Sequence, residues 1–265
     1  MTRDERQAAL DEIANEVRAC TRCRLAEGRT LAVPGEGDPD TEVVLVGEGP
    51  GFNEDREGRP FVGRAGSMLV RLLGSVGWQR DDVFITNVVK CRPPDNRDPQ
   101  PDEIAACAPY LRRQLAVLDP AVVVTLGRYS MAAFMPGARI GQVHGTAAAA
   151  DPETGARNAL AFAMYHPAAA LRSPSVEKDS FEDMTRVPAV LLRARERREG
   201  IDAPATVPAT TAQPAPSSAP DPEPAAAPGP EPASAPAPEP VTHNGAHTLV
   251  AADPAADDAN QLTLF

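Results

Sequence analysis

The chain has 265 residues, enough for one or two domains, and a formal net charge of −11 at pH 7. Of this charge, −8 lies beyond Gly200, where no Lys or Arg occurs, so the first 200 residues carry only −3. The overall acidity therefore does not exclude a polyanionic partner for the first 200 residues. No N-terminal signal pattern and no apolar run of about 18 residues occurs, which predicts a soluble, cytoplasmic protein. We also expect a monomer.

The first 200 residues alternate between helical and strand-like patterns. Residues 4–19 predict an amphipathic helix with Leu10, Ile13 and Val17 on one face. Short apolar runs predict strands at 43–46, 83–87, 122–126 and 160–165. Helical patterns separate or follow these strands at 66–76, 102–118, 128–135 and 178–198. This alternation predicts a three-layer α/β/α fold around a central, mainly parallel four-stranded sheet.

The C-terminal quarter has a different composition. Thirteen prolines occur between Pro204 and Pro240, and no aromatic residue lies between Phe181 and Phe265. Such a segment buries too little apolar area to offset the entropy of ordering it. We therefore predict a folded domain at 1–199, a disordered acidic linker at 200–260 and a short apolar terminus at 261–265.

The stretch from residue 47 to residue 63 connects the first predicted strand to the next helix. Its glycines, among them Gly49 and Gly51, allow the backbone to approach a ligand closely. Three carboxylates and one aromatic ring are the other notable groups: Glu48, Glu54, Asp55 and Phe61. The missing Gly-Lys-Ser/Thr ending excludes a P-loop, while an ordinary glycine-rich connection remains an alternative.

Polar residues follow all four predicted strands. Glu48 follows the first strand, Asn87 ends the second, Arg128 follows the third and His166 follows the fourth. The carboxyl ends of parallel strands lie along one edge of a sheet, where open α/β folds bind ligands. We therefore expect these residues to converge on one crevice.

The chain has four cysteines, and the first two form a C-x2-C pair. They are Cys20, Cys23, Cys91 and Cys107. Without an export signal two disulfides are not expected, and four thiolates suit either zinc or an iron–sulfur cluster. Four unrelated core cysteines are the alternative. Because none of the four lies at a predicted strand end, we expect a structural centre outside the crevice.

Three motifs occur in order: G-E-G-P-G-x-x-E-D-x-x-G-R-P-F-V-G-x-A-G from Gly47, N-V-V-K-C-R-P-P-x-N-R-x-P from Asn87, and H-P-A-A-A-L-R from His166. Together with the cysteine spacing, they resemble the family 4 uracil-DNA glycosylases over residues 8–195. The resemblance implies a [4Fe–4S] cluster on the four cysteines. It also implies an enzyme that flips uracil out of DNA and hydrolyses its N-glycosidic bond, leaving an abasic site. The family commonly has Ala at the position of Gly49. A related branch cross-links to uracil through a histidine that residues 90–94 here lack, which favours ordinary turnover.

The resemblance also suggests roles for individual residues. Phe61 would stack on the base, with Gly49 and Gly51 lining the site, and Asn87 would read uracil O4 and N3–H. His166 would donate a hydrogen bond to uracil O2 as negative charge develops there. A carboxylate would stabilise the sugar and orient water, with Glu54 the first candidate and Glu48 the second.

Further residues would contact the DNA itself. Leu171 would fill the gap left by the flipped base, and Arg172 would contact a phosphate or the stack. Other basic residues form a candidate backbone footprint: Arg59, Arg64, Lys90, Arg92 and Arg97.

The chain ends on Gln261-Leu262-Thr263-Leu264-Phe265, which resembles the Q-L-x-L-F peptide that docks bacterial DNA-processing proteins on the replication sliding clamp. Gln261, Leu262, Leu264 and Phe265 would make that contact. For the folded domain, two alternatives to a uracil-DNA glycosylase remain open: a non-catalytic iron–sulfur or zinc module that binds nucleic acid, and a glycosylase with a broader range of deaminated bases.

Overall fold

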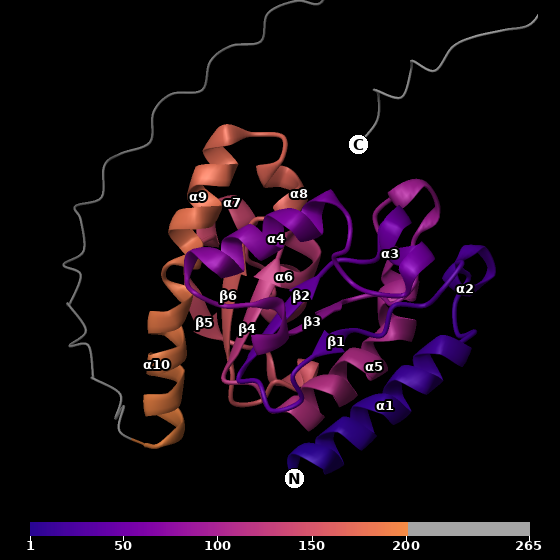
Figure 1. The fold of residues 1–265 in the computed structure, drawn as a ribbon, viewed down its shortest axis with the longest axis horizontal. Coiled ribbons are helices and arrows are strands. Elements are labelled where there is room, and N and C mark those ends of the chain that lie inside the picture. The colour runs from indigo at the N-terminus through magenta and orange to yellow at the C-terminus, as the bar shows by residue number, and fades with distance from the viewer. Residues whose placement is uncertain (201–265) are drawn as a thin grey trace, which may run out of the picture. The chain divides into compact units, whose positions relative to one another are not determined.

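The computed structural model describes residues 1–200, which form an α/β fold around one mixed sheet (Figure 1). Its strand order is β1-β3-β2-β4-β6-β5. The four central strands are parallel: β2 (Val43–Gly47), β3 (Phe84–Asn87), β4 (Val122–Leu126) and β6 (Leu160–Met164). These four were predicted from their apolar runs to within one residue at each end. Every residue in them is buried, as parallel strands covered on both faces should be.

The sequence did not predict the two edge strands. These are β1 (Glu36–Gly37) and β5 (Ala147–Ala149), each antiparallel to its neighbour. They are two and three residues long and partly exposed. Segments this short show no apolar periodicity, which is why the sequence did not predict them. The predicted centre of four parallel strands is confirmed, and one antiparallel strand extends it on each side.

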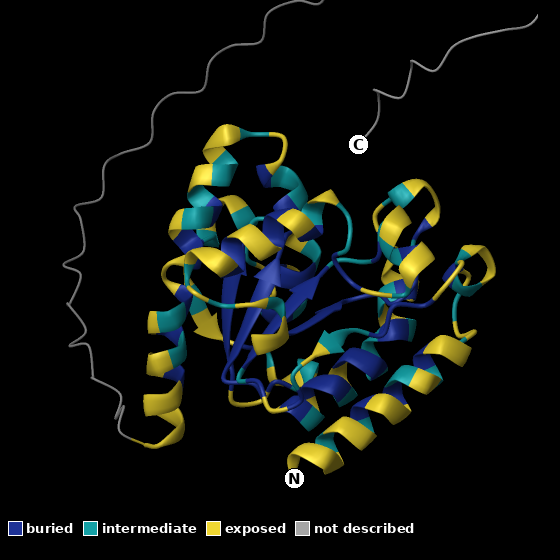
Figure 2. Ribbon diagram, viewed as in Figure 1, coloured by how far each residue is buried: buried dark blue, intermediate teal, exposed yellow. Residues whose placement is uncertain are grey.

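Helices cover the two faces of the sheet, which confirms the three-layer arrangement. Alternate residues of β2 point to opposite faces: Val44 and Val46 belong to one apolar cluster, Val43 and Leu45 to the other. On the first face lie α1 (Arg3–Ala19), α5 (Pro101–Leu118) and α6 (Arg128–Phe134). On the second lie α4 (Arg64–Ser75), α9 (Pro174–Met184) and α10 (Val187–Arg198). Figure 2 shows the buried sheet and the exposed outer sides of the helices.

Shorter helices complete the described part of the chain. They are α2 (Leu25–Gly28), α3 (Phe52–Glu57), α7 (Ile140–Val143) and α8 (Pro167–Ala170). The predicted loop after β2 therefore contains a helix, α3. The predicted single helix at 178–198 is wrong, because the structure has α9 and α10 with a break at Thr185 and Arg186. Pro188 lies in the first turn of α10, where a missing N–H costs nothing.

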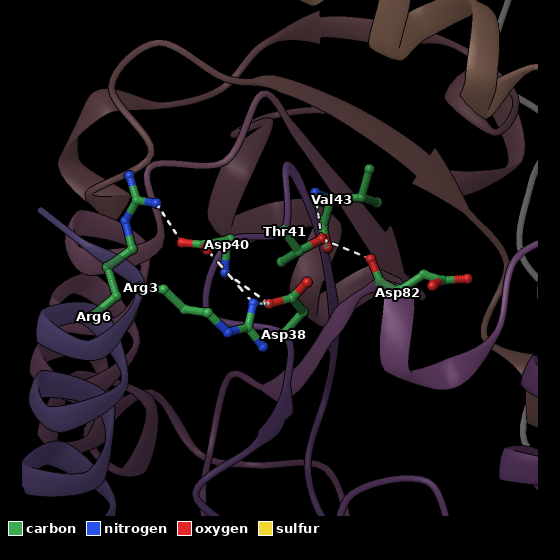
Figure 3. Close-up of polar contacts among 7 residues, drawn as sticks. All are labelled: Arg3, Arg6, Asp38, Asp40, Thr41, Val43 and Asp82. Carbon is green, nitrogen blue, oxygen red and sulfur yellow. Dashed lines mark hydrogen bonds and ion pairs between the residues drawn. The ribbon is translucent and has the colours of Figure 1, made fainter.

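The loop before β2 is held at the amino end of the sheet (Figure 3). Arg6 of α1 pairs with Asp40 at 2.8 Å. The Thr41 hydroxyl donates to the Asp82 carbonyl at 3.0 Å and accepts the Val43 N–H at 3.1 Å. These bonds hold the start of β2 beside the segment that enters β3. They therefore help to fix the relative position of Gly47 and Asn87, at the carboxyl ends of the two strands.

Within residues 1–200, no helix has the length and apolar character needed to cross a membrane. The predicted linker at 200–260, beyond its first residue, lies outside the described residues. So do Gln261, Leu262, Leu264 and Phe265 of the predicted clamp-binding terminus.

Candidate active site

The structure brings the residues after the central strands together at one edge of the sheet. Gly47 of β2 lies beside Asn87 of β3 in the parallel register. A methyl group on Gly47 would lie 2.4 Å from Asn87 Oδ1 and 2.7 Å from Phe61 Cζ. The ring centroids of Phe61 and His166 are 5.7 Å apart, with the planes inclined by 28°. The predicted convergence is therefore observed for Asn87 and His166, which both lie beside the Phe61 ring. Gly47 is required because two side chains lie directly on its backbone.

Asn87 presents an unpaired acceptor in this site. Its side chain is 2% exposed, and its Oδ1 has no hydrogen-bond partner among the described residues. A buried amide oxygen without a partner costs about 1–3 kcal/mol, so native structures rarely keep one without a reason. The position of Oδ1 beside the Phe61 ring suits a donor on a planar ligand.

His166 is held as a neutral donor. It precedes the first turn of α8, and its Nδ1 accepts the Ala168 N–H at 3.1 Å. An accepting Nδ1 carries no proton, so the proton of the neutral ring lies on Nε2. Burial, and then the nearby charge of Arg172, lower the pKa of His166 to about 4, while Glu54 opposes the shift. The imidazole is therefore uncharged at neutral pH and can donate from Nε2.

The two candidate acids occupy different environments. Glu54 Oε1 accepts the N–H groups of Val62 and Gly63 at 2.9 and 3.0 Å, which ties α3 to the segment after Phe61. Burial raises the pKa of Glu48 to about 7, with Asp98 adding to the shift and Arg128 opposing it. Glu54 is thus a carboxylate held by donors, whereas Glu48 titrates near neutrality.

The glycines of the loop lie close to the groups that form the site. A methyl group on Gly51 would approach Glu54 Oε2 to 2.8 Å, and one on Gly49 would approach the Val89 side chain to 2.7 Å. Asp55 is buried and accepts the Thr30 N–H at 2.9 Å. Asp55 therefore anchors α3 to the preceding segment and does not face the pocket as a free carboxylate.

The Phe61 backbone adopts a left-handed conformation with φ of 51°. Such a conformation costs a non-glycine residue about 1–3 kcal/mol unless the surroundings hold it. Arg80 donates from Nη1 to the Phe61 carbonyl at 3.0 Å and from Nη2 to the Pro60 carbonyl. Its Nε donates to Glu36 at 2.9 Å. Sequence reasoning missed Arg80, because no pattern links it to a backbone turn 19 residues earlier.

The predicted DNA footprint is only partly compatible with the structure. Lys90 is wrong as a surface contact, because it is 1% exposed and donates to the Asn87 carbonyl at 2.9 Å and to Gln114 at 2.7 Å. Arg59 and Arg97 are paired with Glu36 and Glu103, respectively. The remaining predicted contacts are at least partly exposed: Arg64, Arg92, Leu171 and Arg172.

The four cysteines carry free thiols and lie on the first face of the sheet. Cys91 and Cys107 are buried in the cluster beneath α1 and α5, and Cys20 and Cys23 pack against it. Phe61 belongs to the cluster on the opposite face. Cys107 Sγ accepts the Lys90 N–H at 3.2 Å, and Cys91 Sγ accepts from Arg29 at 3.0 Å.

Burial raises the pKa of the Cys107 thiol to about 11 and also raises that of Cys91. In residues 1–200, no three His, Cys, Asp or Glu side chains converge closely enough to share one metal ion.

A shallow cavity of about 780 Å³ lies at the opposite edge of the sheet. Its lining includes Arg112, Asp119 and Asn158, which precede β4 and β6 or lie on α5. None of the predicted base-contacting residues lines it, so its volume does not make it the catalytic site.

Fold and site together define an α/β protein that brings Phe61, Asn87 and His166 together at the carboxyl ends of its parallel strands. Residues 34–187 match the family described as the Uracil DNA glycosylase superfamily. A type-4 uracil-DNA glycosylase of Saccharolobus solfataricus is 48% identical over 188 residues, which is 69% of this chain and 86% of that protein. One of Archaeoglobus fulgidus is 41% identical over 184 residues, covering 68% and 92%. A type-5 uracil-DNA glycosylase of Thermus thermophilus is 38% identical over 118 residues, covering 39% and 53%. The chain belongs to the uracil-DNA glycosylase superfamily.

Proposed function

We propose that this protein removes uracil from DNA by hydrolysing its N-glycosidic bond, leaving an abasic site in DNA repair. The observation that carries the proposal is the buried, unpaired Asn87 Oδ1 beside the Phe61 ring. A flat base with a donor at the matching position would pair that oxygen and stack on the ring. The type-4 glycosylases that are 41–48% identical to the chain support the same conclusion.

Asn87 discriminates uracil from cytosine by the direction of its hydrogen bonds. Its Oδ1 accepts uracil N3–H, and its amide N–H donates to O4. Cytosine has an acceptor at N3 and a donor at C4, so both bonds would be mismatched in a buried site. Sites built around buried polar groups reject such analogues strongly, because the groups are left unpaired.

His166 stabilises the departing base. As the glycosidic bond lengthens, negative charge develops on uracil O2, and the His166 Nε2–H donates to it. A fixed neutral donor stabilises the transition state more than the ground state, because the acceptor gains charge during the reaction. The low pKa of about 4 keeps the ring in this form at neutral pH.

A carboxylate stabilises the sugar, which becomes cationic in the transition state. We assign Glu54 this role and the orientation of water, with Glu48 as the second candidate. The two backbone N–H groups that donate to Glu54 Oε1 fix the position of this carboxyl group. Leu171, 37% exposed at the end of α8, would fill the gap in the stack, and Arg172 would contact the backbone.

The donor set of the four cysteines fits an iron–sulfur cluster, which we propose as [4Fe–4S]. Thiols without disulfides and N–H and guanidinium donors to sulfur are features of such sites. Each thiolate would bind a different iron atom, so the sulfurs need not converge on one point. The cluster would supply a covalent link between the segment after α1 and α5. Brown protein with four irons per chain after anaerobic purification supports this assignment, and a single zinc ion contradicts it.

We further propose that Gln261, Leu262, Leu264 and Phe265 bind the replication sliding clamp. The support is the sequence Q-L-T-L-F alone. A peptide of residues 255–265 should bind the clamp with a Kd on the order of micromolar. No binding at millimolar clamp refutes this part, whatever the glycosylase does.

One assay tests the main proposal. Purified protein is incubated with single- and double-stranded oligonucleotides that carry uracil, hypoxanthine, cytosine or a mismatched thymine, and abasic sites are detected by alkaline cleavage. Release of uracil alone supports the proposal, and release of hypoxanthine as well would show the broader glycosylase. Binding without release of any base would overturn the proposal in favour of a non-catalytic module.

A further inference from the structure

An exposed aromatic ring lies next to the candidate active site and takes no part in the chemistry proposed above. Phe52 is the first residue of α3, two positions before Glu54, and it is 51% exposed. A single exposed apolar side chain is common on protein surfaces, so the groups around Phe52 decide whether it has a role.

Two arginines flank the Phe52 ring. The Arg56 guanidinium carbon lies 5.5 Å from the ring centroid and that of Arg92 lies 5.2 Å from it. Arg56 is one helical turn from Phe52 on α3, whereas Arg92 comes from the segment after β3. Arg92 Nε donates to Asn96 Oδ1 at 2.8 Å, so its head group is held in position. The cluster therefore joins two elements that border the site.

The charges of this cluster are free to meet a ligand. Three other arginines are paired with carboxylates: Arg59 with Glu36, Arg97 with Glu103 and Arg128 with Asp98. Arg56 and Arg92 have no carboxylate partner within the part of the chain that the structure describes. An aromatic face between two unpaired guanidinium groups suits a nucleobase with its phosphates, because the base stacks and the cations bind the backbone. An apolar protein surface would instead desolvate both charges.

The position of the cluster also fits a DNA strand. α3 follows β2, whereas α8 with its exposed Leu171 follows β6, and β4 lies between these strands in the sheet. Phe52 and Leu171 therefore follow strands on either side of β4, at the same sheet edge as Asn87 and His166. When uracil flips out of a DNA strand, the neighbouring base on that strand loses its stacking partner.

We propose that Phe52, Arg56 and Arg92 bind the nucleotide next to the flipped uracil on the same strand, with its base stacked on Phe52. This inference rests on the proposed glycosylase function. Stacking of this kind does not depend on the identity of the base, since every base has a flat face.

The test measures binding and catalysis separately. The Kd of a single-stranded oligonucleotide with one 2′-fluoro-deoxyuridine, which resists cleavage, is determined by fluorescence anisotropy. Phe52→Ala should weaken binding about 5- to 160-fold, the loss measured for one base–aromatic stack. Phe52→Trp should restore it, because indole also stacks. The loss should appear in Kd and KM and much less in kcat. Leu192→Ala is the matched control, as Leu192 is 57% exposed on α10, and should change nothing.

The two arginines are tested by salt dependence. Arg56→Gln and Arg92→Gln should each reduce the slope of log K against log salt by about 0.7 on single strands, as expected for one lost phosphate contact. Arg193→Gln, at an exposed arginine of α10, should leave the slope unchanged. If the wild type releases uracil but Phe52→Ala binds the oligonucleotide as tightly, this inference is wrong and the proposed function stands. If the wild type releases no base, the proposed function fails and this inference fails with it.

Discussion

Replacing Arg80 with alanine should disable the base pocket without touching any group that contacts the base. Arg80 holds the Phe61 and Pro60 carbonyls, and its side chain is only 18% exposed. A hydrogen bond from a charged donor contributes about 1.5–3 kcal/mol, and the lower value suits a partly exposed pair. Two such bonds give about 3 kcal/mol, which balances or exceeds the strain of about 1–3 kcal/mol in the left-handed Phe61 backbone.

Without Arg80 the strained backbone becomes comparable in free energy to relaxed alternatives. In those alternatives the ring leaves the position where it lies 5.7 Å from the His166 ring. The fraction of molecules with an assembled pocket should fall, and kcat/KM for uracil release should fall with it by about 10- to 100-fold. Arg80→Lys should be intermediate, because one ammonium group cannot reproduce the fork that reaches both carbonyls and Glu36.

The assay pairs kcat/KM on a uracil oligonucleotide with inhibition by free uracil, which reports the pocket itself. Arg59→Ala is the control, because Arg59 shares Glu36 with Arg80 but is not bonded to Phe61. Its side chain is 56% exposed, so its loss should cost less than about 1 kcal/mol in stability and little activity. If Arg80→Ala lowers the melting temperature but leaves kcat/KM and uracil inhibition unchanged, Arg80 supports the fold only and our reasoning about Phe61 is refuted.

Three further predictions concern His166, Glu48 and Asn87. His166→Ala should raise the activation free energy of uracil release by about 2.7–4 kcal/mol. The wild-type rate measured from pH 5 to 8 should show no titration of His166, because burial lowers its pKa to about 4. Glu48 should ionise near pH 7. If its carboxylate takes part in the reaction, the rate of uracil release should rise as the pH passes through 7, and Glu48→Gln should abolish that rise. Since the folded pKa of Glu48 lies above that of the unfolded chain, stability falls as pH rises from about 4.5 to 7, and Glu48→Gln should melt higher than wild type at pH 8. Asn87→Asp should release some cytosine from oligonucleotides, because a carboxyl group accepts from the exocyclic amine; no release counts against direct reading by Asn87.

The parallel centre of the fold could be predicted because its strands are continuous apolar runs with polar residues at their carboxyl ends. The prediction failed where local sequence carries little information. β1 and β5 form because β3 and β6 offer free edges with which they can pair. The two or three residues of each edge strand carry no strand pattern of their own. The break between α9 and α10 was missed because apolar spacing continues across it, although Pro188 marks the first turn of a new helix.

For the site, side chains that follow strands could be found, whereas the groups that position them could not. Asn87, His166 and Phe61 lie in motifs and meet as expected. Lys90 was misplaced on the surface because lysine is almost never fully buried. Its amine is buried because three acceptors surround it: the Thr86 hydroxyl, the Asn87 carbonyl and the Gln114 side chain. Thr86 lies on β3, whereas Gln114 lies on α5, so the acceptors come from separate elements. No spacing in the sequence encodes such a contact.

Arg80 and Lys90 act in the same way on the two residues that would hold the base. Arg80 binds the Phe61 carbonyl at 3.0 Å, and Lys90 binds the Asn87 carbonyl at 2.9 Å. Burial lowers the pKa of Lys90 to about 7, yet its amine retains hydrogens to donate in either protonation state. Each residue is thus fixed through its backbone, which leaves the Phe61 ring and the Asn87 amide free to meet a ligand.

This arrangement explains how the pocket can keep Asn87 Oδ1 buried and unpaired. A flexible asparagine would turn its oxygen to the nearest donor and recover the cost of about 1–3 kcal/mol. With its backbone held by Lys90 and its side chain enclosed beside Gly47 and Phe61, Asn87 has little room to do so. The free-energy cost of the unpaired oxygen would be removed when a bound base donates a hydrogen bond to it. Rigidity supplied by Arg80 and Lys90 would therefore support selectivity for the base.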